Sequence, residues 1–184
     1  TFQNLPDQDS TGHAYTYTLT ENAVDGYLPG VFSGPVHTAA NNTDTYTLTN
    51  TPTHYTVTKL AADTGKALAG ASLQIVKGDG TGYTAADVVD SWLSGSDGTN
   101  PDGTLAPHSL KGKLILGQTY TLMELAAPAG YLKAQPITFT YTADASVTLE
   151  NQPVRVRFAK IDNLTGAMVA GAQYAVYLDS QWQA

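Results

Sequence analysis

The sequence of 184 residues contains no cysteine. This absence excludes disulfides, thiolate metal sites and cysteine nucleophiles. Many small extracellular domains depend on disulfides, so a protein of this kind outside the cell needs another source of stability. Long apolar runs are missing too, and no segment approaches the roughly 20 residues of a transmembrane helix. No signal peptide is recognisable, so we expect a mature or excised piece without membrane insertion.

Positive charge is scarce. The chain has nine Lys and Arg residues against 16 Asp and Glu, for a formal net charge of −7. The imbalance is strongest in residues 1–53, which carry five acidic side chains and neither lysine nor arginine. An acidic chain without a basic patch argues against nucleic acids and anionic membrane surfaces as partners.

Long helix-forming runs are also absent, and short alternating stretches take their place. Alternation of apolar and polar residues is typical of half-buried β-strands, and turn-forming residues separate the stretches. One short helix is expected at residues 84–93. The pattern predicts an all-β, antiparallel sandwich or barrel-like fold. The stretches with strand character are residues 14–21, 45–50, 54–60, 71–76, 118–125, 137–141, 145–151, 154–161 and 172–178.

One of these strands, residues 118–125, carries an acidic residue on its apolar side. Tyr120, Leu122 and Glu124 share one parity, so they point to the same face. Burial of a carboxylate is costly unless the group is paired or neutralised. We therefore expect a partner for Glu124 in the core.

Internal repeats organise the whole chain. TYTLMELAAPAGYL matches TYTLTENAVDGYL with a single one-residue gap, VTLENQP matches YTLTNTP, and TVTKLAADTGKALAGASLQIV matches RFAKIDNLTGAMVAGAQYAVY without gaps. These matches predict the tail of one module at residues 1–53, a complete module at 54–152 and the head of a third at 153–184. The paired positions are Lys59 with Lys160, Glu21 with Glu124, Asn50 with Asn151, and Gly26-Tyr27 with Gly130-Tyr131.

Three polar residues of the middle module fall on core-facing positions: Lys59, Glu124 and Asn151. A desolvated lysine becomes a neutral nucleophilic amine, and a desolvated glutamic acid can stay protonated and move protons. A carboxamide held against the amine reacts with a high effective molarity. The expected product is a Lys–Asn amide, formed with loss of ammonia.

The segments VTKL…DTGKALAGASLQIV, YTLMELAAPAGYL and TLENQP resemble the Cna B-type (SpaA-like) repeat domains of Gram-positive surface adhesins and pilins. The resemblance implies tandem prealbumin-like or inverse immunoglobulin-type β-sandwiches. It also implies an intramolecular isopeptide bond between Lys59 and Asn151, assisted by Glu124. The implied protein is a cell-wall-associated stalk module that contacts neighbouring modules, needs no cofactor and is no enzyme beyond its own single cross-linking turnover.

The chain departs from whole family proteins. We find no LPxTG-type sorting signal and no pilin-linking lysine motif, so anchoring and polymerisation are not implied. Residues 1–53 contain Glu21 and Asn50 without a lysine, and residues 153–184 contain Lys160 without a following Glu or Asn. Our hypothesis is that the two pieces complement each other, within one molecule or between neighbours.

Other interpretations stay open at this stage. Singly, Lys59 could be a strand-end lysine that reaches solvent, Glu124 a rim carboxylate and Asn151 a turn residue. The rival function is a binding module that recognises a host extracellular protein or glycan through an insertion at residues 77–113, and a hydrolase is less favoured. Trp92 is expected as a packing anchor. No metal site is expected, because the histidines lack ligand spacing. These are His13, His37, His54 and His108.

Overall fold

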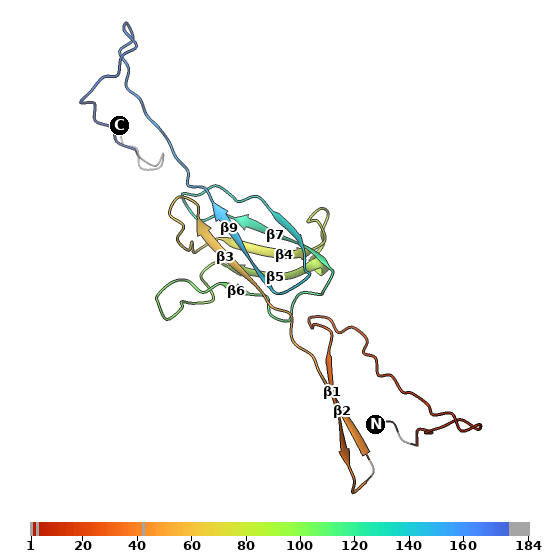
Figure 1. The fold of residues 1–184 in the computed structure, drawn as a ribbon. Helices are drawn as coiled ribbons and strands as arrows, with labels where there is room; N and C mark the ends of the chain where they lie inside the picture. Colours follow the sequence, from red (N-terminus) through yellow and green to blue (C-terminus); the bar gives the residue numbers. More distant parts are fainter. Residues whose placement is uncertain (1, 3, 42, 177–184) are drawn as a thin grey trace. The chain divides into compact units, whose positions relative to one another are not determined.

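A computed structural model describes residues 2, 4–41 and 43–176 (Figure 1). The chain divides into two compact units, Thr1–Pro153 and Val154–Ala184. All named elements lie in the first unit, and the only helical element among the described residues is the 3-10 turn η1 (Ala85–Asp87). The strands are β1 (Val31–Thr38), β2 (Thr43–Thr49), β3 (Tyr55–Ala61), β4 (Ser72–Lys77), β5 (Val88–Leu93), β6 (His108–Ser109), β7 (Thr119–Ala126), β8 (Ile137–Thr140) and β9 (Ala145–Asn151).

Seven of these strands form a sandwich between residues 55 and 151. One sheet has the order β6-β3-β9, and the other has the order β5-β4-β7-β8. The predicted all-β sandwich is confirmed. All its pairings are antiparallel except that of β3 with β9, which lie side by side in parallel, with Tyr55 opposite Ala145 and Ala61 opposite Asn151 (Figure 1).

The core lies between the two sheets, and strand periodicity explains which side chains fill it. Along β3 every second residue is buried, and these residues are Tyr55, Val57, Lys59 and Ala61. In β7 residues on both faces are buried, because one face points into the core and the turn at Gly80 packs on Thr121 and Met123 of the other face. The buried cluster further includes Leu73, Ile75, Leu110, Leu114, Tyr120, Leu122, Tyr141 and Leu149.

The helix expected at residues 84–93 is wrong beyond its first turn. The side chain of Asp87 accepts hydrogen bonds from the backbone N–H and the hydroxyl of Thr84, both at 2.8 Å, which closes a capping box. The chain then continues as β5, which pairs with β4. The β-branched pair at residues 88–89 favours a strand once β4 offers a ladder of hydrogen bonds.

Residues 77–113, expected to be an insertion, are an integral part of the sandwich. They supply β5 to one sheet and β6 to the other, and Leu110 is completely buried in the core. Deletion of this stretch would therefore remove an edge strand from each sheet. The expected insertion is thus wrong as a description of the fold.

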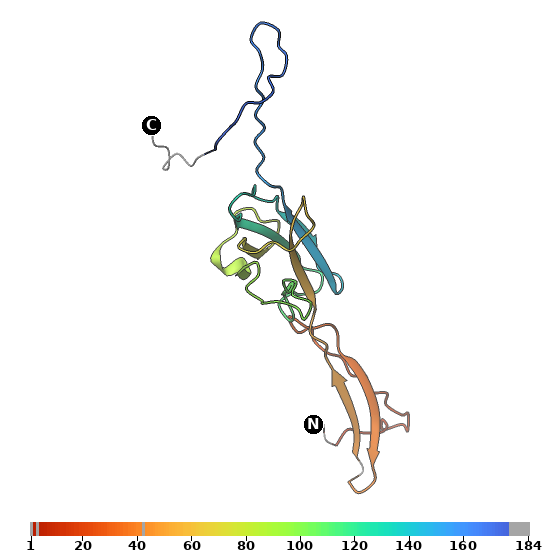
Figure 2. The ribbon, with the colours of Figure 1, turned by 90° about the vertical axis from the view of Figure 1, so that its left-hand side faces the viewer.

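The segment before the sandwich contains the antiparallel hairpin of β1 and β2, drawn as a two-stranded ribbon in Figure 2. The strand predicted at residues 45–50 is present as β2. Residues 15–21 form no strand, since none of the described residues provides a ladder for them. β1 was missed because it contains Gly34-Pro35, typical of a turn. The proline is tolerated because pairing is interrupted between Ser33 and Val36.

Residues 154–176, the described part of the second unit, contain one isolated bridge, Ile161–Met168, and no strand. The strand expected at 154–161 is therefore absent there, and that at 172–178 extends beyond the described residues. The local turn nevertheless copies the sandwich module. Backbone bonds from Asp162 N to Ala167 O (2.9 Å) and from Val169 N to Lys160 O (2.9 Å) repeat bonds around residues 59–68 at matched positions.

Candidate functional site

Strands of both sheets bring the three predicted residues into the core. Lys59 lies on β3, Glu124 on β7 and Asn151 at the end of β9, and their exposed fractions are 6%, 1% and 0%. β3 and β9 are paired so that Lys59 lies opposite Leu149, two residues before Asn151. The predicted parity of all three side chains agrees with this burial.

Glu124 and Asn151 are in direct contact. The amide Nδ2 of Asn151 donates to Glu124 Oε2 at 2.8 Å and to the carbonyl oxygen of Leu132 at 2.7 Å. Glu124 Oε2 also accepts a bond from the backbone N–H of Ala134 at 2.6 Å. The extended segment after β7 thus fixes both side chains, with Nδ2 aimed at the carboxyl group.

The amine of Lys59 bonds to backbone carbonyl groups of β3 and β9. Its Nζ donates to the carbonyl oxygen of Leu149 at 2.9 Å and to that of Leu60 at 3.4 Å. Burial lowers the pKa of Lys59, and the negative charges of Glu124 and Glu150 partly oppose this. A lowered pKa increases the fraction of neutral amine, which is the nucleophilic form.

Two acceptor atoms of the site have no hydrogen-bond partner among the described residues. They are Glu124 Oε1 and Asn151 Oδ1, both completely buried. An unsatisfied buried polar atom costs about 1–3 kcal/mol, so such atoms in a folded protein call for an explanation. A carboxyl oxygen and an amide carbonyl, each free of hydrogen bonds, are groups that can still change their bonding in a reaction.

Family comparison gives the site its context. Residues 53–153 match the prealbumin-like fold domain of SpaA, and residues 1–51 match the Cna protein B-type domain. The chain belongs to the SpaA-type prealbumin-like fold family. The resemblance noted in the sequence is thereby confirmed. No curated protein matches the chain.

Solved structures of low identity are similar to this SpaA-type chain. The shaft pilin SpaA from Lactobacillus rhamnosus GG is 20% identical, with 74% of this chain and 63% of the pilin covered and a TM-score of 0.44. The pilus 2b backbone protein of group B streptococcus is 20% identical, with coverages of 64% and 46% and a TM-score of 0.43. TM-scores this low support no functional conclusion. This chain spans less than two thirds of the length of either protein.

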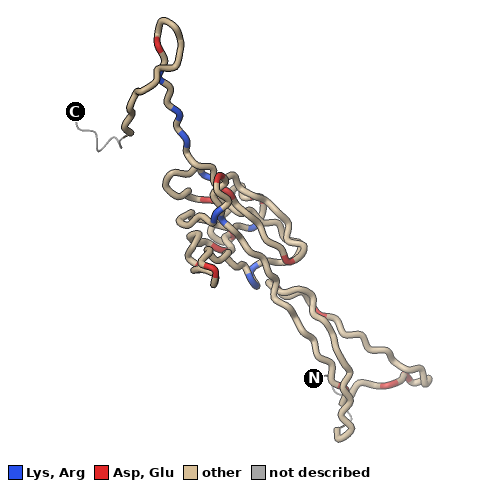
Figure 3. Tube along the Cα trace, turned by 60° about the vertical axis from the view of Figure 1, so that its left-hand side comes forward, with Lys and Arg blue, Asp and Glu red and all other residues tan. Residues whose placement is uncertain are grey.

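A second Glu–Asn pair occurs in the segment before the sandwich. Asn50 Nδ2 donates to Glu21 Oε1 at 2.7 Å, and the backbone N–H of Gly30 donates to Glu21 Oε2 at 2.9 Å. This repeats the bonds of Glu124 with Asn151 and Ala134. Both residues are half-buried, and Figure 3 shows neither lysine nor arginine along this segment. Lys160 is exposed in the second unit.

A polar cluster that the sequence did not reveal lies on the β5 side of the module. The ring of His108 stacks on Trp92 with a centroid distance of 4.0 Å. Its Nε2 lies 2.9 Å from Asp90 Oδ2, and its Nδ1 lies 3.0 Å from both carboxylate oxygens of Asp97. Each ring nitrogen thus lies within hydrogen-bond distance of one of the two carboxylates. The residues come from three separate segments, so no motif of fixed spacing in the sequence predicts the cluster.

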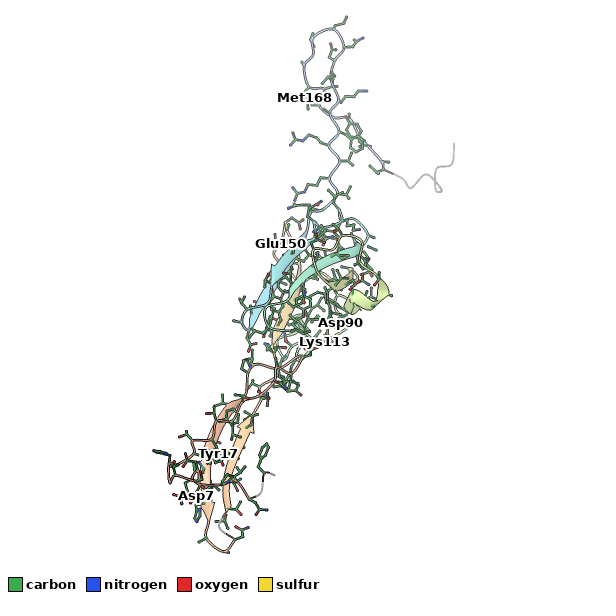
Figure 4. All side chains as sticks on the ribbon, turned by 90° about the vertical axis from the view of Figure 1, so that its right-hand side faces the viewer. Asp7, Tyr17, Asp90, Lys113, Glu150 and Met168 are labelled. Atoms are coloured by element: carbon green, nitrogen blue, oxygen red, sulfur yellow. The ribbon has the colours of Figure 1, made fainter. Side chains whose placement is uncertain are left out.

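Lys113 joins this cluster through an ion pair with Asp90, and Figure 4 labels the two residues next to each other. Burial acts to raise the pKa of Asp90, but the bonds from Lys113 and His108 outweigh it and lower the pKa. The described residues contain no group of three or more His, Cys, Asp or Glu side chains suited to a metal ion. A small cavity of about 20 Å³, room for one water molecule, lies among Trp92, His108 and Lys59.

No helix within residues 2, 4–41 and 43–176 is long and apolar enough to cross a membrane.

Proposed function

We propose that this chain is a structural stalk module of a Gram-positive cell-surface adhesin or pilin, stabilised by an intramolecular isopeptide bond between Lys59 and Asn151. The contact that carries the proposal is the bond from Asn151 Nδ2 to Glu124 Oε2, beside a buried lysine of lowered pKa. Family membership supports the structural role. The proposed location is the cell surface, with neighbouring modules as partners.

The chemistry is an exchange of amines on the Asn151 side chain. The neutral Nζ of Lys59 attacks Cγ of Asn151, a Cγ–Nζ bond forms, and the Cγ–Nδ2 bond breaks. Glu124 takes the proton lost by the attacking amine and delivers a proton to Nδ2, which leaves as ammonia. Lysine amine and asparagine amide thus become one secondary amide and one ammonia, with no cofactor and no change of oxidation state. Alignment of the groups by three strands replaces a bimolecular encounter.

The proposed role of the Lys59–Asn151 bond is to carry mechanical tension. The chain enters the module at the start of β3 and leaves it at the end of β9, and these strands run parallel. Tension on the two ends would shear this pair of strands. A bond between Lys59 and Asn151 would carry the tension directly from β3 to β9, so that the other strands stay unloaded. An amide also resists reduction, which suits a chain without cysteine.

Intact mass spectrometry of the purified chain tests the cross-link. We expect a mass lower than the sequence mass by one ammonia, and a Lys59–Asn151 peptide after digestion. Glu124→Gln keeps both reacting side chains, so it should abolish or strongly slow the loss of ammonia. The exposed Lys133 provides the matched control, because Lys133→Ala should lose ammonia like the parent chain. An unchanged parent mass would refute the cross-link.

Residues 1–53 and 153–184 are proposed as parts of neighbouring modules on either side of the complete one at 54–152. Glu21 and Asn50 already form the acceptor half of a second cross-link site, and Lys160 is the matched donor. If the two parts complement each other, the same mass spectra should contain a second loss of ammonia or covalent oligomers, and Lys160→Ala should remove both. Without such species the complementation is wrong, while the Lys59 cross-link is unaffected.

No observation favours the host-ligand alternative, since residues 77–113 are built into both sheets.

A further inference from the structure

The boundary between residues 1–53 and the sandwich is a contact of two backbones. Gly26 is buried, although the residues around it are mostly exposed. A Cβ atom at position 26 would lie 2.2 Å from the carbonyl oxygen of Gly112 and 3.0 Å from its carbonyl carbon. Real Cβ contacts are never this short, so only glycine fits. The turn at residues 24–27 therefore touches the loop after β6 as closely as two backbones can.

Thr53 lies between the turn at residues 24–27 and the loop after β6, and it forms hydrogen bonds to both. Its side chain is completely buried, and its hydroxyl Oγ1 lies 3.2 Å from the Gly26 carbonyl oxygen and 2.9 Å from that of Leu114. Its backbone N–H donates to Gly26 O at 2.9 Å, and its carbonyl accepts from Gly112 N at 2.8 Å. One residue thus bonds the turn of the preceding segment and two positions of the sandwich loop.

We propose that residues 110–114 of the SpaA-type module form a docking surface for the Gly-Tyr turn of the module that precedes it, and that Thr53 locks this joint. The inference rests on the proposed tandem arrangement but not on the isopeptide bond. The partner is a neighbouring module of the same kind. The features that recognise it are a glycine of positive φ without a side chain and its carbonyl oxygen. This oxygen accepts a bond from the Thr53 N–H and lies 3.2 Å from the Thr53 hydroxyl.

The complete module presents the same turn at its own end. Tyr131 N donates to Pro128 O at 3.2 Å and Leu132 N to Gln152 O at 2.8 Å, which repeats the bonds of Tyr27 and Leu28. Gly130 has φ +84°, against +80° for Gly26, yet a Cβ atom at Gly130 would meet nothing within 4 Å. The conformations match and the contacts differ. Gly130 is therefore a control that separates backbone strain from docking.

The joint has consequences for a stalk. A chain of modules joined by free linkers bends at each boundary, whereas a joint with backbone hydrogen bonds and no room for a side chain holds one orientation. The residue at the position matched to Thr53 is Val154, which lacks the hydroxyl. A joint made with valine would lose the two hydroxyl contacts, so Thr53 is the residue that determines this lock.

Spin-label distance measurements test the proposal. Because the chain has no cysteine, Thr47→Cys and Ser146→Cys place two unique labels at exposed positions on β2 and β9. We expect a narrow distance distribution in the parent chain. Gly26→Ala and Thr53→Val should broaden it several-fold, whereas Gly130→Ala and Thr53→Ser should leave it narrow.

Any distance distribution that differs from these expectations counts against the docking surface. A broad parent distribution would show that no fixed joint exists, and a narrow one in Gly26→Ala would show that the Gly112 contact is dispensable. Equal broadening in Gly26→Ala and Gly130→Ala would assign the effect to strain at positive φ. The intact mass of every variant reports the cross-link independently, so failure of the joint and failure of the proposed isopeptide bond are distinguishable.

Discussion

At the scale of single residues, the main feature of the site is that its polar side chains are buried away from water. Lys59, Glu124 and Asn151 are polar and lie in a core of aliphatic and aromatic side chains. Two hydrogen bonds hold the Asn151 amide nitrogen, while Asn151 Oδ1 and Glu124 Oε1 have no partner in the described part of the chain. Such an arrangement is costly if it is permanent. The proposed cross-link would account for this cost, because the three groups would react once and then keep a neutral amide.

The lowered pKa of Lys59 predicts a pH dependence in a chain that cannot cross-link. Its folded-state pKa lies below the ordinary 10.5, so folding favours the neutral amine. The stabilising contribution is present above pH 10.5 and is lost as the pH falls through the lowered pKa. In Asn151→Ala, the free energy of unfolding from urea titrations should therefore rise with pH over this window.

The control for this prediction is the double variant Lys59→Met, Asn151→Ala, which has the same deletion but no titrating amine. The difference between the two unfolding curves isolates Lys59. A difference that is independent of pH would mean that the amine reaches solvent and that burial does not govern its ionisation.

At the scale of elements, loops and edge strands are held by side chains from distant segments. The loop at residues 94–107 connects β5 to β6 and is tied down by His108, which contacts Asp97 in the loop and Asp90 on β5. The β3–β9 pair is held by parallel ladder bonds, and Asn151 at the end of β9 continues this line to Glu124. The elements therefore depend on tertiary contacts more than on their own propensity.

Replacement of His108 should loosen this loop. His108→Phe keeps a ring against Trp92 but removes both contacts with carboxylates, at a cost of about 1–3 kcal/mol. We expect faster hydrogen exchange at the Ala106 N–H, which bonds to Gly98 O at 3.0 Å, with no change in β7. His13, whose side chain is 84% exposed, gives the control variant His13→Phe. Unchanged exchange at Ala106 would contradict a clamp role for His108.

At the scale of the whole molecule, the proposed bond links the first and last strands of the sandwich. The cross-link closes a loop of roughly 90 residues, for which the chain-entropy model gives on the order of 4–5 kcal/mol. Lys59→Met, close in shape and without the amine, should therefore lower the thermal midpoint and the resistance to protease.

Lys133→Met is the matched control for this stability prediction, because Lys133 is exposed on the same module. It should unfold like the parent chain. If Lys59→Met were equally stable, the bond would contribute no measurable stability, whatever the mass spectra show.

The features that follow from local periodicity and from repetition are predictable from the amino-acid order alone. Alternation placed Tyr55, Val57 and Lys59 on one face of β3, and the repeats paired Glu21 with Glu124 and Asn50 with Asn151. Tertiary structure decided the rest. Residues 15–21 alternate like a strand but find no ladder partner within the described part of the chain, whereas β5 gains one from β4 and becomes a strand. The backbone groups of Leu132 and Ala134, the His108 cluster and the Gly26–Gly112 contact join segments far apart in the chain. A one-dimensional pattern records which face a side chain takes, but not which distant backbone will meet it.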